Sequence, residues 1–457
     1  MSAKRAELKE PLVHERTLIR GARIVDPASG RDEVADVAID GEHVVNIGRV
    51  SASFEPQRIV DAAGLVAMPG LVDLAVRLKE PGREHEGLLE SELAAAAAGG
   101  VTSIVCPPDT DPTLDEPGLV EMLKLRARKL GRCRLFPLGA LTRGLAGESL
   151  TEMAELTEAG CVGFSQADAA VVDTQTLMRA LQYAATFDYT VWLRPQDAWL
   201  GRGGVAASGA VATRLGLSGV PVAAETVALH TIFELMRATG ARVHLARLSS
   251  AAGVELLRAA RREGLRVTAD ASIHSLHLTD VDIGFFEPAM RVTPPLRQAR
   301  DRDALRAALA DGTIDALVSD HNPVESDAKQ LPFAEAEPGG SGVELLLSLA
   351  LKWGRDQGLE LAKTLGAVTS APAQVLGAAL GAHARSAGRL IEGGVADVCL
   401  FDPAASWRVE PAALRSQGKH TAFAFDINGF EMPGRVRMTW VAGALAHDAS
   451  GATTAHD

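Results

Sequence analysis

Polar side chains follow most of the short β-branched runs in the middle of the chain, and their types could support acid–base or anion-binding chemistry. Carboxylates can act as general bases or metal ligands, whereas guanidinium groups stay protonated and bind anions. The residues at these positions are Ala75, Arg77, Asp109, Gln166, Arg194, Arg247, Asp270, Asp320 and His321. The alternative interpretation is that these are ordinary loop residues. The recurrence of polar residues at the ends of successive β-branched runs argues against it.

The histidines of the chain, twelve in number, indicate no further site. His274 and His277 are three residues apart in IHSLH, and His321 follows the last of the runs. Two histidines at this spacing more often face a core or solvent than a metal ion. The sequence contains no G-x-S-x-G motif, so no serine nucleophile is indicated.

The elements that must position these residues alternate between strand and helix. Helical patterns such as TLMRALQYAATFD and VELLRAARREG separate eight β-branched runs. Strict alternation predicts parallel strands joined by right-handed crossovers, and eight repeats predict a closed (β/α)8 TIM barrel. In that fold the chemistry lies at the carboxyl ends of the strands. The runs are residues 71–76, 102–106, 134–140, 161–165, 190–194, 242–247, 266–270 and 315–319.

Both ends of the chain differ from this middle. Residues 17–70 read as short strands with an Asp-Gly turn at 40–41, and residues 390–403 and 435–448 have the same character. We therefore expect an α/β protein in which both termini build one small β-sandwich domain. The predicted division is 1–68 and 387–457 for that domain and 69–386 for the barrel.

Composition excludes several classes of protein. Of the 457 residues, 47% are apolar and 23% charged, which is typical of a globular chain with a large core. The net charge of −12 argues against nucleic acid as a partner. We expect no membrane span and a cytoplasmic protein, because no uncharged apolar run is long enough and the N-terminus is too charged for a signal peptide. The four cysteines lack C-x-x-C spacing and predict reduced core thiols.

Motifs in order along nearly the whole chain resemble the dihydroorotases of the cyclic amidohydrolase superfamily. They include PGLVDLAVRLKEPG, AAAAGGVTSIVCPPDTDP, GFSQAD, VHLARLSSAAGVELLRAARREG, TPPLR, DGTIDALVSDHNP and GRLIEGGVADVCLFDP. The resemblance implies the barrel already predicted and, in an active member, one or two zinc ions at its mouth.

The metal-ligand positions that the resemblance implies are almost all substituted. Ala75 and Arg77 stand where the family has its H-x-H pair, and Gln166 stands at the bridging carboxylate or modified lysine. Arg194 and Arg247 replace the histidines that close the fifth and sixth strands. Only Asp320, the family's catalytic base and ligand, remains. No metal and no other cofactor is therefore expected, although an active homologue would hold zinc.

The substrate positions are substituted as well. Lys79 replaces the arginine for the substrate carboxylate, and Asp109 replaces the asparagine of the M-P-N-T motif. Thr293 replaces the asparagine before P-P-L-R, and Val324 replaces the second histidine of D-H-x-P-H. A carboxylate at position 109 would repel a dianionic substrate.

Arginine has no lone pair to donate and repels a divalent cation. We infer that Arg77, Arg194 and Arg247 exclude a metal ion. Buried carboxylates need partners, so we expect these arginines to pair with the aspartates of the mouth and to replace the structural role of the metal. The aspartates expected as partners are Asp73, Asp109, Asp270 and Asp320.

Three functions are compatible with this pattern. The losses, and the run from His321 to Gly339, resemble a group of inactive dihydroorotase-like chains that assemble with the catalytic chain of aspartate transcarbamoylase and support it. This implies a hetero-oligomer or a homo-oligomer within pyrimidine biosynthesis. The alternatives are a divergent cyclic amidohydrolase that uses Asp320 with an altered or absent metal site, and a self-assembling scaffold unrelated to pyrimidines. Without a Lewis acid, amide hydrolysis would lack roughly several kcal/mol of transition-state stabilisation. This disfavours the divergent amidohydrolase.

Overall fold

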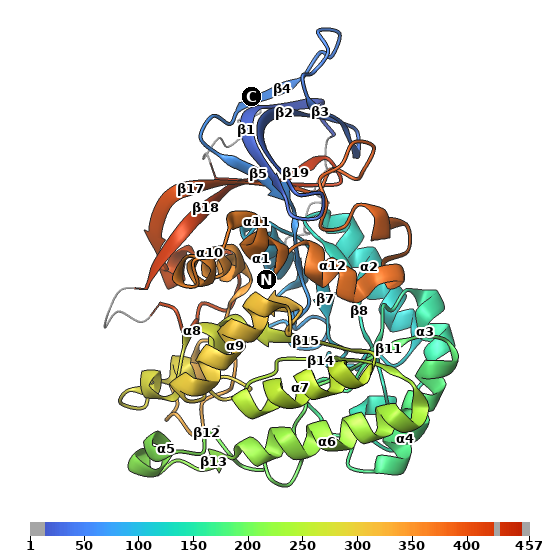
Figure 1. Cartoon of the computed structure of the whole chain (residues 1–457), viewed down its shortest axis with the longest axis vertical. Helices are drawn as coiled ribbons and strands as arrows, with labels where there is room; N and C mark the ends of the chain where they lie inside the picture. The colour runs from blue at the N-terminus through green and yellow to red at the C-terminus, as the bar shows by residue number, and fades with distance from the viewer. Residues whose placement is uncertain (1–13, 425–429, 450–457) are drawn as a thin grey trace, which may run out of the picture.

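The computed structural model describes residues 14–424 and 430–449, and a parallel barrel forms their larger part (Figure 1). Each of the eight predicted runs overlaps a barrel strand, so the predicted fold class is confirmed. The third run is divided into two strands by Leu138. The barrel strands are β6 (Leu71–Asp73), β7 (Val101–Cys106), β8 (Arg134–Pro137) with β9 (Gly139–Ala140), β10 (Phe164–Ser165), β11 (Thr190–Leu193), β14 (Arg242–Leu245), β15 (Val267–Ser272) and β16 (Ala316–Val318).

Closure of the barrel joins its first and last strands. The sheet orders are β6-β7-β8 and β9-β10-β11-β14-β15-β16, and each pairing within them is parallel. A parallel bridge between Val76 and His321 completes the circle. There the amide of Arg77 donates to His321 O at 2.8 Å, and the amide of His321 donates to Ala75 O at 3.0 Å. The first and eighth strand ends therefore lie side by side.

Amphipathic helices cover the barrel. In α7 the buried residues Val254, Leu257 and Ala260 recur at helical spacing, Ser250 caps the first turn, and Gly264 ends the helix at φ +89°. The α-helices are α1 (Leu89–Ala98), α2 (Pro117–Leu130), α3 (Met153–Ala159), α4 (Thr174–Thr186), α5 (Ala210–Leu215), α6 (Val222–Thr239), α7 (Ala251–Glu263), α8 (Ile273–His277), α9 (Ala299–Asp311), α10 (Leu346–Asp356), α11 (Leu361–Gly366) and α12 (Ser370–Leu376).

Shorter elements occupy the connecting segments. They are the 3-10 helices η1 (Arg143–Leu145), η2 (Asp280–Ile283), η3 (Pro288–Met290), η4 (Asp327–Lys329), η5 (Val343–Leu345), η6 (Gly377–Arg385) and η7 (Pro411–Ala413), and the strands β12 (Ala206–Ala207) and β13 (Gly219–Val220). We use the term barrel mouth for the carboxyl ends of the barrel strands and the segments that follow them.

The two ends of the chain build one further sheet, at the top of Figure 1. Its order is β19-β18-β17-β5-β1-β2-β3, and β4 pairs with β1. The antiparallel pairing of β5 with β17 joins the N-terminal and C-terminal strands. The domain boundaries remain predictions, and residues 1–13, 425–429 and 450–457 of the predicted sandwich lie outside the described residues. The strands are β1 (Thr17–Asp26), β2 (Arg31–Asp40), β3 (His43–Gly48), β4 (Arg58–Asp61), β5 (Val66–Pro69), β17 (Val398–Arg408), β18 (Glu431–Val441) and β19 (Ala444–Asp448).

One apolar stretch in the described chain, Leu361–Arg385, is long and apolar enough to cross a membrane by length and composition. The structure divides it among α11, α12 and η6, and the backbone turns at Gly377 with φ +52°. Residues of this stretch pack with the barrel residues Val72 and Val105 in one buried cluster. The stretch is thus a broken core segment. All four cysteines are buried and free, as predicted.

Candidate functional site at the barrel mouth

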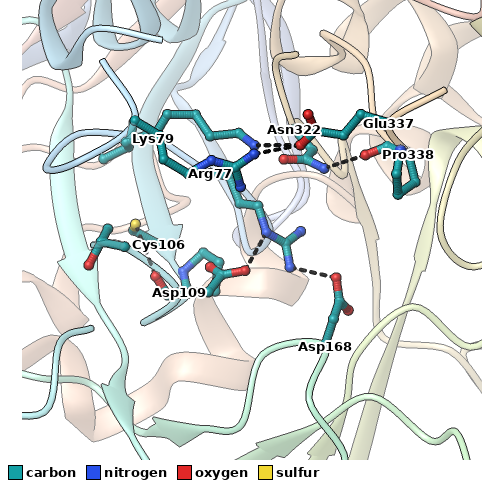
Figure 2. Close-up of a pocket in the computed structure, with 12 residues that line it drawn as sticks. Arg77, Lys79, Cys106, Asp109, Asp168, Asn322, Glu337 and Pro338 are labelled. Atoms are coloured by element: carbon teal, nitrogen blue, oxygen red, sulfur yellow. Dashed lines mark hydrogen bonds and ion pairs between the residues drawn. The ribbon is translucent and has the colours of Figure 1, made fainter. Parts of the chain in front are cut away.

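Six charged residues, five of them predicted, come together at the barrel mouth, and Figure 2 shows Arg77, Asp109 and Asp168 among them. Each lies one to four residues past the end of a strand, and parallel strands of a barrel bring their carboxyl ends to one face. The segments after β6, β7, β10, β11, β14 and β16 carry Arg77, Asp109, Asp168, Arg194, Arg247 and Asp320, respectively.

Asp168 is the centre of this arrangement. Its Oδ2 accepts from Nη2 of Arg77 at 2.8 Å, and its Oδ1 lies 2.7 Å from Nε of Arg194. Nη2 of Arg247 donates to the same Oδ1. Burial raises the pKa of Asp168, but the charges of the three guanidinium groups outweigh burial and hold that pKa well below the usual range. One ionised carboxylate therefore binds three arginines.

Two further carboxylates complete the ion-pair network. Nε of Arg77 donates to Oδ2 of Asp109 at 2.8 Å. Nη1 of Arg247 donates to Oδ1 of Asp320 at 3.1 Å and to the backbone oxygen of Thr293 at 3.1 Å. Burial raises the pKa of Asp320 to about 6, against the attraction of Arg247 and Arg77. Three guanidinium groups thus face three carboxylates.

The expected pairing of arginines with Asp73 and Asp270 is wrong. Asp73 ends β6 and accepts from the backbone amides of Ser319 at 3.1 Å and Ala75 at 3.3 Å. Asp270 lies inside β15, where Oδ2 is 2.8 Å from Nε2 of His244 and Oδ1 accepts from the backbone amide of Arg247 at 2.7 Å. Backbone amides and the His244 imidazole are the partners of these two aspartates, and the buried Oδ2 of Asp73 has no hydrogen-bond partner in the described structure.

Gln166 bonds to the segment after β9 and not to the arginines, whereas Asp168, which was not among the predicted site residues, contacts all three. Oε1 of Gln166 accepts from Thr142 at 3.0 Å, and Nε2 donates to Leu145 O at 2.8 Å. Ala167 has φ +50°, which turns the chain between Gln166 and Asp168. The signal that could have identified Asp168 is an acidic residue three positions past a strand end, in the same GFSQAD motif.

The donor set does not fit a zinc ion. Zinc in proteins takes three or four nitrogen, sulfur or oxygen ligands. Within residues 14–424 and 430–449, no group of three or more His, Cys, Asp and Glu side chains is arranged to hold a metal. Arg77, Arg194 and Arg247 present N–H donors at the positions where the resemblance implies ligands, and Ala75 presents no donor atom.

The nearby histidines do not supply the missing ligands. Nδ1 of His321 accepts from the amide of Gly342 at 3.1 Å, so Nε2 carries the proton and donates to Glu92 at 2.8 Å. His274 is buried 3.8 Å from Oδ2 of Asp320, and neither of its ring nitrogens has a hydrogen-bond partner. Nε2 of His277 lies 3.0 Å from Leu349 O. The three rings therefore point to different neighbours.

Beside the arginines lies a cavity of about 170 Å³. Its wall includes Arg77, Lys79, Arg83, Cys106, Asp109, Asp168, Asn322 and Glu337 (Figure 2). Nζ of Lys79 lies 2.6 Å from Oε2 of Glu86, and burial lowers the pKa of Lys79. Thr293 takes part through its backbone oxygen, and Val324 is fully buried. Of the four predicted substrate positions, Lys79, Asp109 and Thr293 are thus bonded to other groups of the chain, and Val324 is packed in the interior.

Comparisons with known proteins give a consistent set of relatives. The family model described as "Dihydro-orotase-like" matches residues 64–252. A "Dihydroorotase-like protein" of Pseudomonas aeruginosa is 46% identical over 430 residues, covering 94% of this chain and 99% of the relative. A "Dihydroorotase" of Citrifermentans bemidjiense is 38% identical and covers 94% of this chain and 99% of the relative.

Solved structures agree on the fold. The L-hydantoinase (dihydropyrimidinase) from Arthrobacter aurescens superposes with a TM-score of 0.82 at 24% identity, covering 95% of this chain and 96% of the other. The dihydropyrimidinase from Brevibacillus agri gives a TM-score of 0.77 at 21% identity and covers 94% of each chain. These likenesses support the architecture alone.

Proposed function

The chain belongs to the dihydroorotase-like family of the amidohydrolase superfamily, and we propose that it is a non-catalytic member that serves as an assembly subunit for aspartate transcarbamoylase in pyrimidine biosynthesis. The observation that supports a non-catalytic role is the convergence of Arg77, Arg194 and Arg247 on Asp168. The network occupies the mouth where the chemistry of a barrel hydrolase takes place.

Loss of catalysis follows from the chemistry of these side chains. Hydrolysis of a cyclic amide needs a polarised carbonyl and an activated water, which a metal ion supplies together. Guanidinium groups cannot bind a metal ion or take a proton from water. Asp320 could still accept a proton, because its pKa of about 6 suits a general base. However, its Oδ1 already accepts a hydrogen bond from Arg247.

The assembly role rests on the resemblance of the substitutions, and of the segment after β16, to inactive chains that accompany the transcarbamoylase. A fold kept at full length without its metal ligands is expected where the surface, and not the mouth, is under selection. The relatives named dihydroorotase-like and dihydroorotase both match this chain over 94% of its length. An oligomer with the transcarbamoylase catalytic chain, with no resident metal, is the arrangement we propose.

The decisive experiment compares the purified chain alone with the chain mixed with the aspartate transcarbamoylase of its host. We expect substoichiometric zinc by plasma mass spectrometry, no dihydroorotate turnover, comigration of the two proteins in size-exclusion chromatography, and lower transcarbamoylase activity when the chain is withheld. Stoichiometric zinc together with turnover would overturn the proposal. Turnover without zinc that disappears in Asp320→Asn would instead establish the divergent hydrolase, and self-assembly without comigration would favour a scaffold.

A further inference from the structure

A strap of residues 322–340 crosses one side of the barrel mouth and is fixed at several points. At its base the amide of Asn322 donates to Gly340 O at 3.0 Å, and Nδ2 of Asn322 donates to Pro338 O at 3.0 Å. In its middle, Nζ of Lys329 donates to the backbone oxygens of Pro288 at 3.0 Å and Arg291 at 2.9 Å. The strap is therefore anchored independently of the contacts made by Glu337.

Glu337 is the strap residue that reaches the wall of the cavity. Its Oε1 lies 2.6 Å from Nη2 of Arg83 and 4.0 Å from Nζ of Lys79 (Figure 2). Both cations also contact Glu86, which lies on the same loop as they do. Glu337 is 254 positions away from Arg83 in the sequence. Two cations of one loop are thus neutralised by one local and one distant carboxylate.

The two carboxylates differ in accessibility. The side chains of Lys79 and Glu86 are 4% and 2% exposed while Glu337 is in place, and Lys79 lines the cavity. The side chains of Arg83 and Glu337 are 40% and 32% exposed. An exposed ion pair contributes only about 1 kcal/mol or less, so a solute anion can compete with the Glu337 carboxylate.

Charge at the cavity identifies what could compete. If the Glu337 carboxylate moves away, Lys79 and Arg83 share the single negative charge of Glu86. One positive charge is then unbalanced beside a cavity of about 170 Å³, which has room for a small organic anion. The carboxylates of Asp109 and Asp168 line the same cavity and repel a second negative charge.

We propose that Glu337 is an internal autoinhibitory anion, which occupies in cis a position where a small monocarboxylate would otherwise contact Lys79 and Arg83. The strap holds this carboxylate in place, so a solute anion must compete with it for the basic wall of the cavity. The inference does not depend on the assembly role, because it concerns the mouth of the isolated chain and not a partner. Its failure would leave the proposed function untouched.

The test measures binding of sodium acetate to the full-length chain by isothermal titration calorimetry at constant ionic strength. Glu337→Gln keeps the shape of the side chain and removes its charge. Glu335→Gln is the matched control, because Glu335 is an exposed strap residue with no side-chain partner in the described structure. If the Glu337 carboxylate leaves its place beside Arg83 about a tenth of the time in the wild type, Glu337→Gln binds acetate about tenfold more tightly than the wild type and Glu335→Gln do.

A second variant locates the binding. Arg83→Gln in the Glu337→Gln background should abolish the gain, and succinate should bind this background more weakly than acetate does. Equal acetate binding by the wild type and Glu337→Gln, or no binding by either, would overturn the proposal. A gain that survives Arg83→Gln would also overturn it. Circular dichroism and thermal unfolding establish that all variants are folded at the temperature of the titration.

Discussion

The carboxylate of Asp168 contacts three guanidinium groups, so its charge decides whether the cations of the mouth are balanced. In Asp168→Asn a neutral amide replaces this carboxylate, and the three arginines keep only Asp109 and Asp320 as anionic partners. Removing one partner of a buried ion pair costs about 3–5 kcal/mol. Because the Asp168 side chain is 35% exposed, we expect Asp168→Asn to lower the free energy of unfolding by about 2–3 kcal/mol. Urea denaturation at pH 7 measures this loss.

Glu121→Gln is the control for this prediction, because Glu121 is exposed on α2 and has no side-chain partner in the described structure. The effect also has a defined pH dependence. The folded pKa of Asp168 is depressed, so its stabilisation is present above the ordinary pKa of about 3.9 and is lost as the pH falls. The gap between the wild type and Asp168→Asn should narrow below about pH 4. A gap unchanged at lower pH would contradict the prediction.

Arg194 is the site for testing whether a single ligand can be restored. Its Nε contacts Asp168 at 2.7 Å, and Nη1 donates to Gln196. We expect Arg194→His to lower the free energy of unfolding by about 1–2 kcal/mol, because an imidazole cannot reproduce both contacts. One new histidine does not provide the three ligands that zinc needs, so metal content should not rise. Arg214→His, at an exposed residue of α5, is the control, and a zinc-loaded variant of unchanged stability would refute the prediction.

At the scale of the elements, alternation of strand and helix predicts the strand ends but not the direction of each side chain there. All eight runs hold a strand because their β-branched residues recur between amphipathic helices. Which aspartate faces the arginines depends instead on local backbone geometry. Ala167, at φ +50°, lies between Gln166, which bonds to Thr142 and Leu145, and Asp168, which meets the arginines. No periodicity in the sequence reports such a turn, and so the central residue of the site was missed.

Lys329 anchors the strap through η4, and its titration gives a third prediction. Burial is the main cause that lowers the pKa of Lys329 to about 7, and the charge of Arg291 adds to it. Between about pH 7 and 10.4 the unfolded chain holds a proton that the folded chain has released, so the stabilisation increases with pH across this window. A neutral amine keeps two N–H groups, which match its two carbonyl partners.

We expect Lys329→Gln to lack this titration. Its free energy of unfolding should fall behind that of the wild type by up to about 1.4 kcal/mol for each pH unit above 7. Urea denaturation at intervals from pH 6 to about pH 9 measures the slope. Lys363→Gln, at an exposed residue of α11, should follow the wild type throughout. Parallel curves for Lys329→Gln and the wild type would show that Lys329 stays protonated in the folded chain.

At the scale of the whole molecule, a buried carboxylate connects parts of the chain that are far apart in sequence. Glu92 of α1 lies 2.8 Å from Nε2 of His321, just past β16. It also accepts from Oγ of Ser416 at 2.6 Å and from the amide of Gln417 at 2.9 Å, both in the segment between β17 and β18. The donors His321 and Ser416 outweigh burial and lower the pKa of Glu92. The site at the mouth and the terminal sheet therefore share one anchor.

Glu92→Gln tests whether this anchor holds the two parts together. An amide presents an N–H group to donors that need an acceptor, so we expect the free energy of unfolding to fall by about 2–3 kcal/mol. The segment held by Glu92 should also open more often, with faster tryptic cleavage after the exposed residues Arg415 and Lys419. Glu158→Gln, at an exposed residue of α3, controls for the loss of charge in a helix. Faster cleavage without a loss of stability would restrict the role of Glu92 to that segment. Unchanged cleavage and unchanged stability would mean that the remaining contacts hold the barrel and the terminal sheet together without Glu92.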